Sequence, residues 1–417
     1  MRSIARRVRR LLIGVVVVLL APVLGLAALA GSAMVGQEPA VFRTAGLAVF
    51  AAILFLGLLL CVPRPVGRWW RALRAAALLA VEGLVVWQVT VAAVTPLQAG
   101  APPPVAGQRF WDLPTGSRLA YVRAAPRKPG TSPPVVFLHG RADLAGAVAA
   151  VGPLAKVGYD VYVYDRLGAG RSQRLADPSG YGLARDVADL DAVRQAVGAE
   201  RLILIGHSDG AQVAAAYLAE HPENVAQVVF SSPSSLGPTP ATALVSRLEA
   251  GQRVRLALSL LQPRALAAAT LLRVDPASAH ALVGDAEMDA RFDRQEELSA
   301  AALHCPGARV PPLAAGAGGY TNLAHVPPGL SVRQRLAAVQ VPALVIKGAC
   351  DYLPWSSAVD YRRAVPGARL VMVRGAGHDA YRDQAGPYLA TVRAFLSGGT
   401  LATYTGDTPP PGYLGPP

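Results

Sequence analysis

Three long apolar runs dominate the first hundred residues of the chain. Residues 11–36 and 44–62 carry no charge, and residues 75–95 carry only Glu82. Each run has about the 20 residues that a helix needs to cross a bilayer, and none alternates with polar positions as a core helix does. The pattern predicts a transmembrane region over residues 1–95, anchored in a lipid bilayer by these three spans.

A different pattern begins after the Pro-rich segment 96–107, which we interpret as a semi-rigid linker. Short apolar runs alternate there with stretches whose apolar residues recur at helical spacing. The expected strands are 108–113, 118–122, 135–138, 161–164, 202–205, 228–230, 343–346 and 370–373. The first two favour an antiparallel hairpin. The later repeats predict an α/β domain over 108–396, with a mostly parallel sheet and helices on both faces.

Two segments depart from this alternation. Residues 232–338 contain apolar runs at helical spacing and predict an all-helical cap over the carboxyl edge of the sheet, where α/β proteins bind ligands. Residues 397–417 are rich in Gly, Pro and Thr without an apolar period, so we expect a disordered tail.

The charge is distributed unevenly. The chain has a formal net charge of +13, but residues 1–100 hold ten arginines, no lysine and only two acidic residues, so they supply +8 of it. The remainder gives no case for nucleic-acid binding. Arginines cluster before the first span and between the second and third, at Arg2, Arg6, Arg7, Arg9, Arg10, Arg64, Arg68, Arg71 and Arg74. By the positive-inside rule, the N-terminus is cytoplasmic and the α/β domain lies outside the cytoplasm.

Two questions about the spans stay open. The Arg-rich start, the apolar run and the sequence Ala28-Leu29-Ala30 also fit a cleaved signal peptide, after which the α/β domain would still end outside. A carboxylate such as Glu82 is costly in lipid, so it either marks a functional site, or faces a partner helix, or lies near the cytoplasmic headgroups.

Residues 202–211, Leu-Ile-Leu-Ile-Gly-His-Ser-Asp-Gly-Ala, combine a strand, a sharp turn and the start of a helix. Four branched apolar residues predict a strand buried on both faces. A Gly-x-Ser-x-Gly pentapeptide follows, as a nucleophile elbow requires, with glycines where strand and helix pass close to the serine. Ser208 would then lie at a helix N-terminus, which favours developing negative charge. The alternative is a Gly-rich turn with a surface serine.

Further motifs make the segment 108–396 resemble the α/β-hydrolase family. His139-Gly140 follows the third expected strand, and Asp165-Arg166-Leu167-Gly168-Ala169-Gly170-Arg171-Ser172 matches the DxxGxGxS loop of many capped members. Asp351 follows the seventh strand and His378 the last, in the family's order of serine, acid and histidine. The resemblance implies a catalytic triad of Ser208, Asp351 and His378, and it implies no cofactor.

The chemistry needs these residue types. A serine hydroxyl becomes nucleophilic when a neutral imidazole accepts its proton, and an aspartate holds that imidazole in the right tautomer. The family takes two oxyanion N–H donors from the residue after the nucleophile and from the loop after the third strand, here Asp209 and Arg141. The chain departs from many relatives at the second donor, because Arg141-Ala142-Asp143 follows His139-Gly140 where they have a Gly or Pro.

Other chemistry-bearing residues allow several interpretations. We expect His207 to be structural, and Asp379, a rival acid by composition, to point away from His378. His221, His280, His304 and His325 lack metal-ligand spacing, so no metal site is expected. Cys305 and Cys350 either form a disulfide between cap and acid loop or remain free thiols. Asp285, Asp289 and Asp293 recur every fourth residue; they either form a solvated helix face or, as in the proline-iminopeptidase-like branch, bind a substrate's amino terminus.

The first hypothesis is a membrane-anchored extracytoplasmic serine hydrolase that cleaves a small carboxylic ester or an amide. A proline-iminopeptidase-like aminopeptidase acting on short peptides is the alternative within this class. The alternative from another class is a non-catalytic membrane receptor or interaction protein built on a hydrolase fold.

Overall fold

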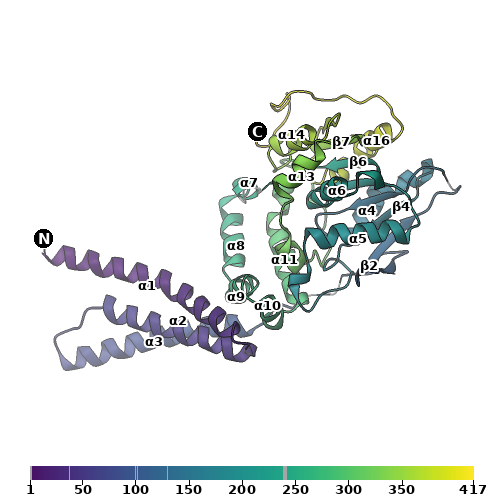
Figure 1. Ribbon diagram of the computed structural model, residues 1–417. Coiled ribbons are helices and arrows are strands. Elements are labelled where there is room, and N and C mark those ends of the chain that lie inside the picture. Colours follow the sequence, from purple (N-terminus) through teal and green to yellow (C-terminus); the bar gives the residue numbers. More distant parts are fainter. Residues whose placement is uncertain (1, 37, 99, 101, 129, 238–241) are drawn as a thin grey trace. The chain divides into compact units, whose positions relative to one another are not determined.

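The computed structural model describes residues 2–36, 38–98, 100, 102–128, 130–237 and 242–417 (Figure 1). The chain divides into two compact units. The first contains Met1–Gln98 together with Ala176–Pro178 and Leu258–Glu287, and the second contains the remaining residues.

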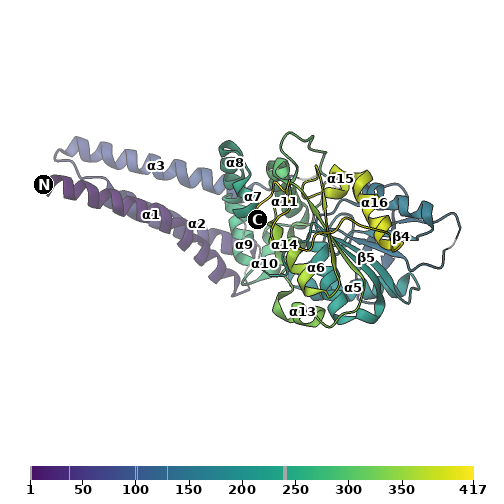
Figure 2. The same ribbon diagram turned by 90° about the horizontal axis from the view of Figure 1, so that it is seen from above.

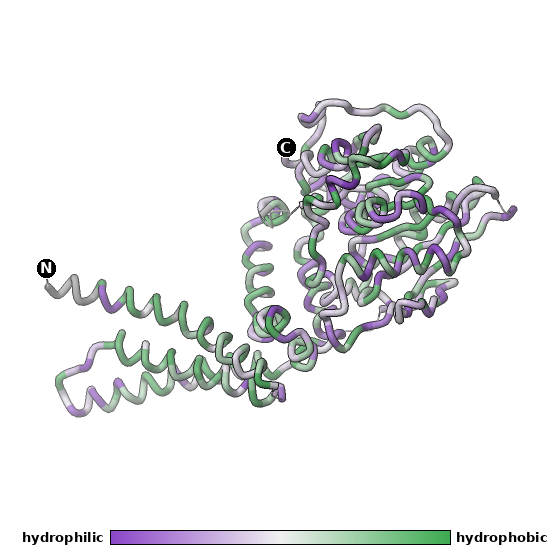
Figure 3. Tube along the Cα trace, viewed as in Figure 1, coloured by the Kyte–Doolittle hydropathy of each residue, from purple (hydrophilic) through white to green (hydrophobic). Residues whose placement is uncertain are grey.

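The first unit is helical. Its long helices are α1 (Arg2–Ala33), α2 (Pro39–Cys61) and α3 (Arg68–Val94), and its short helices are α9 (Pro263–Leu271) and α10 (Pro276–Leu282). The three helices are long and apolar enough to cross a membrane, and Figure 3 shows that most of their residues are hydrophobic. They begin several residues before the expected spans, since arginine is compatible with a helix and Pro39 suits a first turn. Helices α1 and α2 pack closely at Gly25 and Gly46, where a Cβ on Gly46 would lie 2.9 Å from the Gly25 oxygen.

The second unit is built on an eight-stranded sheet of order β1-β2-β4-β3-β5-β6-β7-β8. The strands are β1 (Arg109–Asp112), β2 (Arg118–Ala124), β3 (Val135–Leu138), β4 (Val161–Tyr164), β5 (Leu202–His207), β6 (Val225–Ser231), β7 (Ala343–Gly348) and β8 (Arg369–Val373). Strand β2 pairs antiparallel with β1 and with β4, and all other pairings are parallel. Strands β3, β5 and β7 are buried along their whole length. The predicted α/β fold with a mostly parallel sheet is confirmed.

Helices cover both faces of this sheet (Figure 2). Helices α4 (Leu144–Val151), α15 (Ala380–Asp383) and α16 (Ala385–Leu396) share one buried core with the strands. Helices α5 (Leu183–Ala196), α6 (Asp209–Glu220) and α14 (Trp355–Ala364) lie on the other face. Short 3-10 turns occur at Gly152–Val157, Pro178–Gly180, Pro222–Asn224 and Ala300–Leu303. Because β5, β6, β7 and β8 run parallel, the carboxyl ends of β5, β7 and β8 lie at the same edge of the sheet.

Between β6 and β7 the described residues form helices and connecting loops and no strand. Outside the first unit this segment forms α7 (Thr242–Ser246), most of α8 (Ala250–Leu260) and of α11 (Asp285–Ser299), α12 (Gly319–Ala324) and α13 (Gly329–Leu336). The sequence predicts one cap, whereas the middle of this segment folds with the spans. The reason is that Arg264 of α9 donates a hydrogen bond of 3.1 Å to the Ala93 carbonyl at the end of α3.

The C-terminal segment also differs from its prediction. In place of a disordered tail, residues 401–416 lie against the second unit without forming helix or strand. The Trp355 N–H donates to the Pro416 carbonyl, the Leu414 N–H donates to the Ala349 carbonyl, and the Tyr413 ring packs edge-on against Trp355. A segment without an apolar period can still be held by backbone hydrogen bonds and by single aromatic anchors.

Candidate active site

The turn between β5 and α6 holds Ser208 in a strained conformation. Its φ of 54° and ψ of −120° lie in a region that costs a non-glycine residue about 1–3 kcal/mol. The strain persists because neighbouring backbones leave no room to relax. A Cβ on Gly210 would lie 2.1 Å from the Leu138 carbonyl oxygen, and one on Gly206 would lie 2.5 Å from the Gly210 oxygen. The turn therefore has the nucleophile-elbow geometry expected from the sequence.

Ser208, His378 and Asp351 meet at the carboxyl edge of the sheet. Their hydrogen bonds join Ser208 Oγ to His378 Nε2 at 3.0 Å and His378 Nδ1 to Asp351 Oδ1 at 2.9 Å. Asp351 Oδ1 also accepts from the Leu353 N–H at 3.0 Å, which fixes the carboxylate. The three residues come from the loops after β5, β7 and β8, so parallel strands bring them together from positions far apart in the sequence.

Charges around His378 and Asp351 favour an ion pair between them. Burial disfavours the charged imidazolium, but the carboxylates of Asp351 and Asp379 outweigh it and raise the pKa of His378 above its ordinary value. Burial likewise disfavours ionised Asp351, yet Lys347 and His378 hold the pKa of that carboxyl well below its usual range. Asp351 is therefore held in its ionised form beside His378.

Lys347 is a member of this site that the sequence reasoning did not identify. It lies on β7, is fully buried, and places Nζ 2.9 Å from Asp351 Oδ2 and 3.2 Å from Ser357 Oγ. A fully buried cation needs such partners, because its desolvation otherwise costs several kcal/mol. The signal in the sequence was a lysine in an otherwise apolar strand, four residues before the candidate acid.

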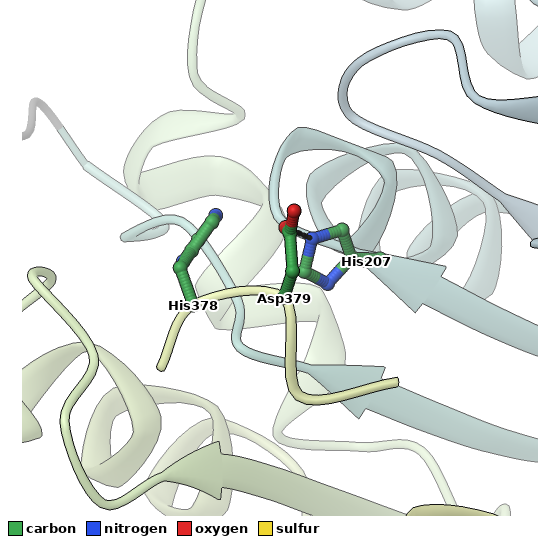
Figure 4. A group of neighbouring side chains, drawn as sticks. All are labelled: His207, His378 and Asp379. Carbon is green, nitrogen blue, oxygen red and sulfur yellow. Dashed lines mark hydrogen bonds and ion pairs between the residues drawn. The ribbon is translucent and has the colours of Figure 1, made fainter. Parts of the chain in front are cut away.

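A second histidine–aspartate pair lies beside the first. His207 Nε2 and Asp379 Oδ1 are 3.1 Å apart, and Figure 4 shows the Asp379 carboxylate turned toward the His207 ring. The prediction that Asp379 does not serve as the acid for His378 agrees with this arrangement. His207, His378 and Asp379 offer ligand atoms within 4.8 Å of one another. His378 Nε2 could bind a cation there only by giving up its hydrogen bond to Ser208.

The two expected oxyanion donors lie at the same pocket. Arg141 and Asp209 both line it, and a Cβ on Gly140 would lie 2.9 Å from the Ser208 Cβ, so the loop after β3 lies directly against the elbow. The buried Arg166 holds this loop by donating to the Gly140 carbonyl at 2.9 Å and to Asp186 Oδ2 at 2.8 Å. The loop position suits the role expected of the Arg141 N–H.

The pocket above Ser208 is small and mixed in character, with a volume of about 130 Å³. Its wall includes Phe292, Leu303, Tyr352 and Tyr381 as well as charged side chains. Arg141 Nε lies 3.2 Å from Glu296 Oε2, and burial raises the pKa of Glu296 although Arg141 opposes that change. The pocket therefore presents a carboxyl group whose charge is partly balanced by an arginine.

The acidic series on α11 has structural partners. Asp289 accepts from Arg174 at 2.7 Å and from the Gly319 N–H at 2.8 Å, and Asp293 accepts from the N–H groups of Gly316 and Ala317. Asp285 lies 2.8 Å from His280. The carboxylates thus form neither a solvated face nor a free amine-binding cluster. Glu296 is the acidic residue of α11 that lines the pocket.

Cys305 and Cys350 are joined by a disulfide. The bond links the chain just after the Ala300–Leu303 turn to the residue before Asp351. In the same region, the His378 N–H donates to the Leu303 carbonyl at 2.6 Å. Two independent bonds therefore hold the end of the cap against the loops that carry the acid and the histidine.

Comparison with known proteins identifies one family to which the chain is similar. A family model described as alpha/beta hydrolase fold matches residues 133–385. A proline iminopeptidase of Heyndrickxia coagulans is 36% identical over 125 residues, which are 30% of this chain and 42% of that protein. A (lyso)-N-acylphosphatidylethanolamine lipase of Mus musculus is 25% identical over 295 residues, covering 68% of this chain and 84% of the lipase.

A solved alpha/beta fold family hydrolase of Bacillus anthracis str. Sterne has a TM-score of 0.50 and 17% identity. The match covers 69% of this chain and 98% of that one, and it shows a shared fold. The family model extends over more than half of the sequence, and its range includes the elbow, the acid loop and the histidine loop. The chain belongs to the α/β-hydrolase fold family and is a hydrolase of that fold.

Proposed function

We propose that the protein is a membrane-anchored serine hydrolase that cleaves a carboxylic ester or amide through an acyl-enzyme on Ser208. The observation that carries the proposal is the hydrogen-bonded series Ser208–His378–Asp351 at the strained elbow. The raised pKa of His378 supports its role as the base, because a more basic imidazole is a better proton acceptor in its neutral form.

The reaction has two halves. Ser208 Oγ attacks the carbonyl carbon as its proton passes to His378 Nε2, and the resulting oxyanion accepts hydrogen bonds from the N–H groups of Asp209 and Arg141. The C–O or C–N bond then breaks, and His378 gives the proton to the leaving group. A water molecule, deprotonated by His378, attacks the acyl-serine. The carboxylic acid leaves, and Ser208 regains its proton.

The test is labelling of the full-length protein in detergent with a fluorophosphonate probe. We expect Ser208→Ala to abolish labelling and His378→Ala to slow it on the order of 10⁴-fold. Ser234→Ala is the matched control, because Ser234 Oγ lies 3.3 Å from Ser208 Oγ and has no bond to His378 among those described. Folded protein that does not label would contradict the proposal and favour the receptor alternative.

An aminopeptidase activity of the proline-iminopeptidase type is the second candidate. The Glu296 carboxyl at the pocket supports it, since a substrate's ammonium group could replace Arg141 as its partner. The Heyndrickxia coagulans relative is a proline iminopeptidase, whereas the Mus musculus relative is a lipase. A panel of acyl esters and aminoacyl amides separates the two, and Glu296→Gln should raise KM for the amides alone.

The proposed location has the N-terminus in the cytoplasm and the second unit outside. The arginines before α1 and between α2 and α3 support this topology. A reporter that is active only outside the cytoplasm should be active when fused after Gln98 and inactive when fused after Pro65; the reverse would overturn the topology. The burial of Leu29 against Gly46 supports a first span that is retained rather than cleaved, which the intact mass of the purified protein tests.

A further inference from the structure

An apolar cavity of about 220 Å³ lies within the first unit. It exceeds the roughly 150 Å³ of an engineered apolar cavity that admits benzene. Its walls come from the three spans and from α9 and α10. The lining residues include Pro22, Leu29, Arg43, Ala93, Arg264 and Ala267. Apart from the two arginines, the lining consists of glycine, alanine, proline and larger apolar residues.

The cavity lies at one end of the helical unit. Leu29 is near the C-terminus of α1, Arg43 is in the second turn of α2, and Ala93 is next to the last residue of α3. From Ala33, where α1 ends, to Pro22 is about 16 Å along a helix. In a bilayer the cavity would therefore extend from the headgroup level into the hydrocarbon.

The two arginines differ in their partners. Arg264 is buried, and its guanidinium donates to both Glu287 oxygens at 2.8 and 2.6 Å and to the Leu282 carbonyl at 2.6 Å. Its charge is balanced by Glu287. Arg43 is half-buried, and it forms no hydrogen bond or ion pair with any residue in the described part of the chain. The cavity thus has one uncompensated cation at its headgroup end.

We propose that this cavity binds an anionic phospholipid of the bilayer, with an acyl chain inside it and the headgroup phosphate on Arg43. Hydrocarbon is the abundant apolar ligand at that depth, and a guanidinium presents two parallel donors to phosphate oxygens. The inference rests on the proposed insertion of the spans into a membrane and does not depend on the chemistry of Ser208. The lipid would fill the space between the spans and the cap segment Leu258–Glu287.

The test measures lipid binding by native mass spectrometry of the full-length protein in neutral detergent. We expect dioleoyl phosphatidylglycerol to bind more tightly than dioleoyl phosphatidylcholine. Arg43→Gln should weaken phosphatidylglycerol binding roughly tenfold and leave phosphatidylcholine unchanged. Arg68→Gln is the matched control, since it removes an arginine at the opposite end of the helices, and it should bind as the unmodified chain does.

A second variant tests the cavity itself. Ala267→Phe places a ring in the space and should weaken both lipids. If it does not fold, Arg43→Gln and the lipid comparison still decide. Equal binding of the two lipids, unchanged binding by Arg43→Gln, displacement by inorganic phosphate, or a lipid-free dimer would each overturn the proposal. Ser208→Ala should bind lipid normally, so failure of the proposed hydrolysis is distinguishable from failure of this site.

Discussion

At the scale of single residues, the proposed mechanism gives Asp351 a cation on either side once His378 has accepted a proton. Lys347 contacts one carboxylate oxygen and His378 the other, and both lower the pKa of Asp351. Lys347 has the opposite effect on His378, whose pKa it lowers through its charge. The buried lysine therefore keeps the acid ionised and limits how basic the histidine becomes.

Replacing Lys347 by methionine should separate these effects. The free energy of unfolding should fall by about 3–5 kcal/mol, because Asp351 loses a buried partner. The acid limb of kcat/KM should move to higher pH, since the charge that lowers the pKa of His378 is gone. Chemical denaturation and a pH–rate profile of the full-length protein measure the two changes. If the acid limb of the pH–rate profile stays at the same pH, Lys347 has only a structural role.

Asp379→Asn should shift the same limb in the other direction. In the proposed mechanism the base form of His378 is the active one, so activity should rise with pH through a pKa above the ordinary value of about 6.5. Removing one of the carboxylates that raise this pKa moves the rise to lower pH. The control is Asp360→Asn on α14, whose carboxylate pairs with Arg333. Coincident profiles for Asp379→Asn and the unmodified chain would contradict the argument.

Three site residues could be expected from the sequence because each follows a recognisable strand in a fixed order. Ser208 has a local motif, while Asp351 and His378 depend on the order of strands. Lys347 and Glu296 could not be assigned in this way. The partners of Lys347 depend on the side-chain packing of a buried strand, and the contact between Glu296 and Arg141 joins segments about 150 residues apart, so neither leaves a short-range pattern.

At the scale of elements, the site depends on how the end of the cap is fixed. The disulfide Cys305–Cys350 closes a loop with a sequence separation of 45 residues. The double change Cys305→Ser/Cys350→Ser should lower the free energy of unfolding by about 2–4 kcal/mol. Cys61→Ser is the control, since Cys61 is a free thiol. Two alkylated thiols in unreduced protein at these positions would show that the bond does not form.

The apolar pattern of the sequence is informative for the strands and uninformative for the C-terminal segment. The strands were predictable because buried parallel strands are continuous apolar runs. The C-terminal segment was not, since its attachment rests on backbone hydrogen bonds and on Tyr413 beside Trp355. Such anchors have no period. Composition alone therefore indicates disorder for a segment that is held in place.

At the scale of the whole molecule, the sequence distinguishes the membrane-spanning helices from the hydrolase domain. It does not show that part of the cap segment belongs to the same compact unit as the spans. The apolar faces of α9 and α10 indicate that these helices pack against another apolar surface. That surface could equally be the sheet or the membrane-spanning helices. The hydrogen bond from Arg264 to the end of α3 decides the matter, and it joins positions 171 residues apart. A cap segment contributed to the membrane unit could be recognised only in three dimensions.

This division predicts how a truncated chain behaves. A fragment of residues 99–417 keeps Ser208, His378 and Asp351, so it should still react with a fluorophosphonate. It lacks the helices that cover α9 and α10, and Arg264 loses its Ala93 acceptor, so the fragment should bind an apolar dye and aggregate without detergent. Adding Leu261→Ser and Leu266→Ser, two residues of the cavity wall, should reduce both. A fragment that is monodisperse and free of dye would show that the cap segment folds independently of the spans.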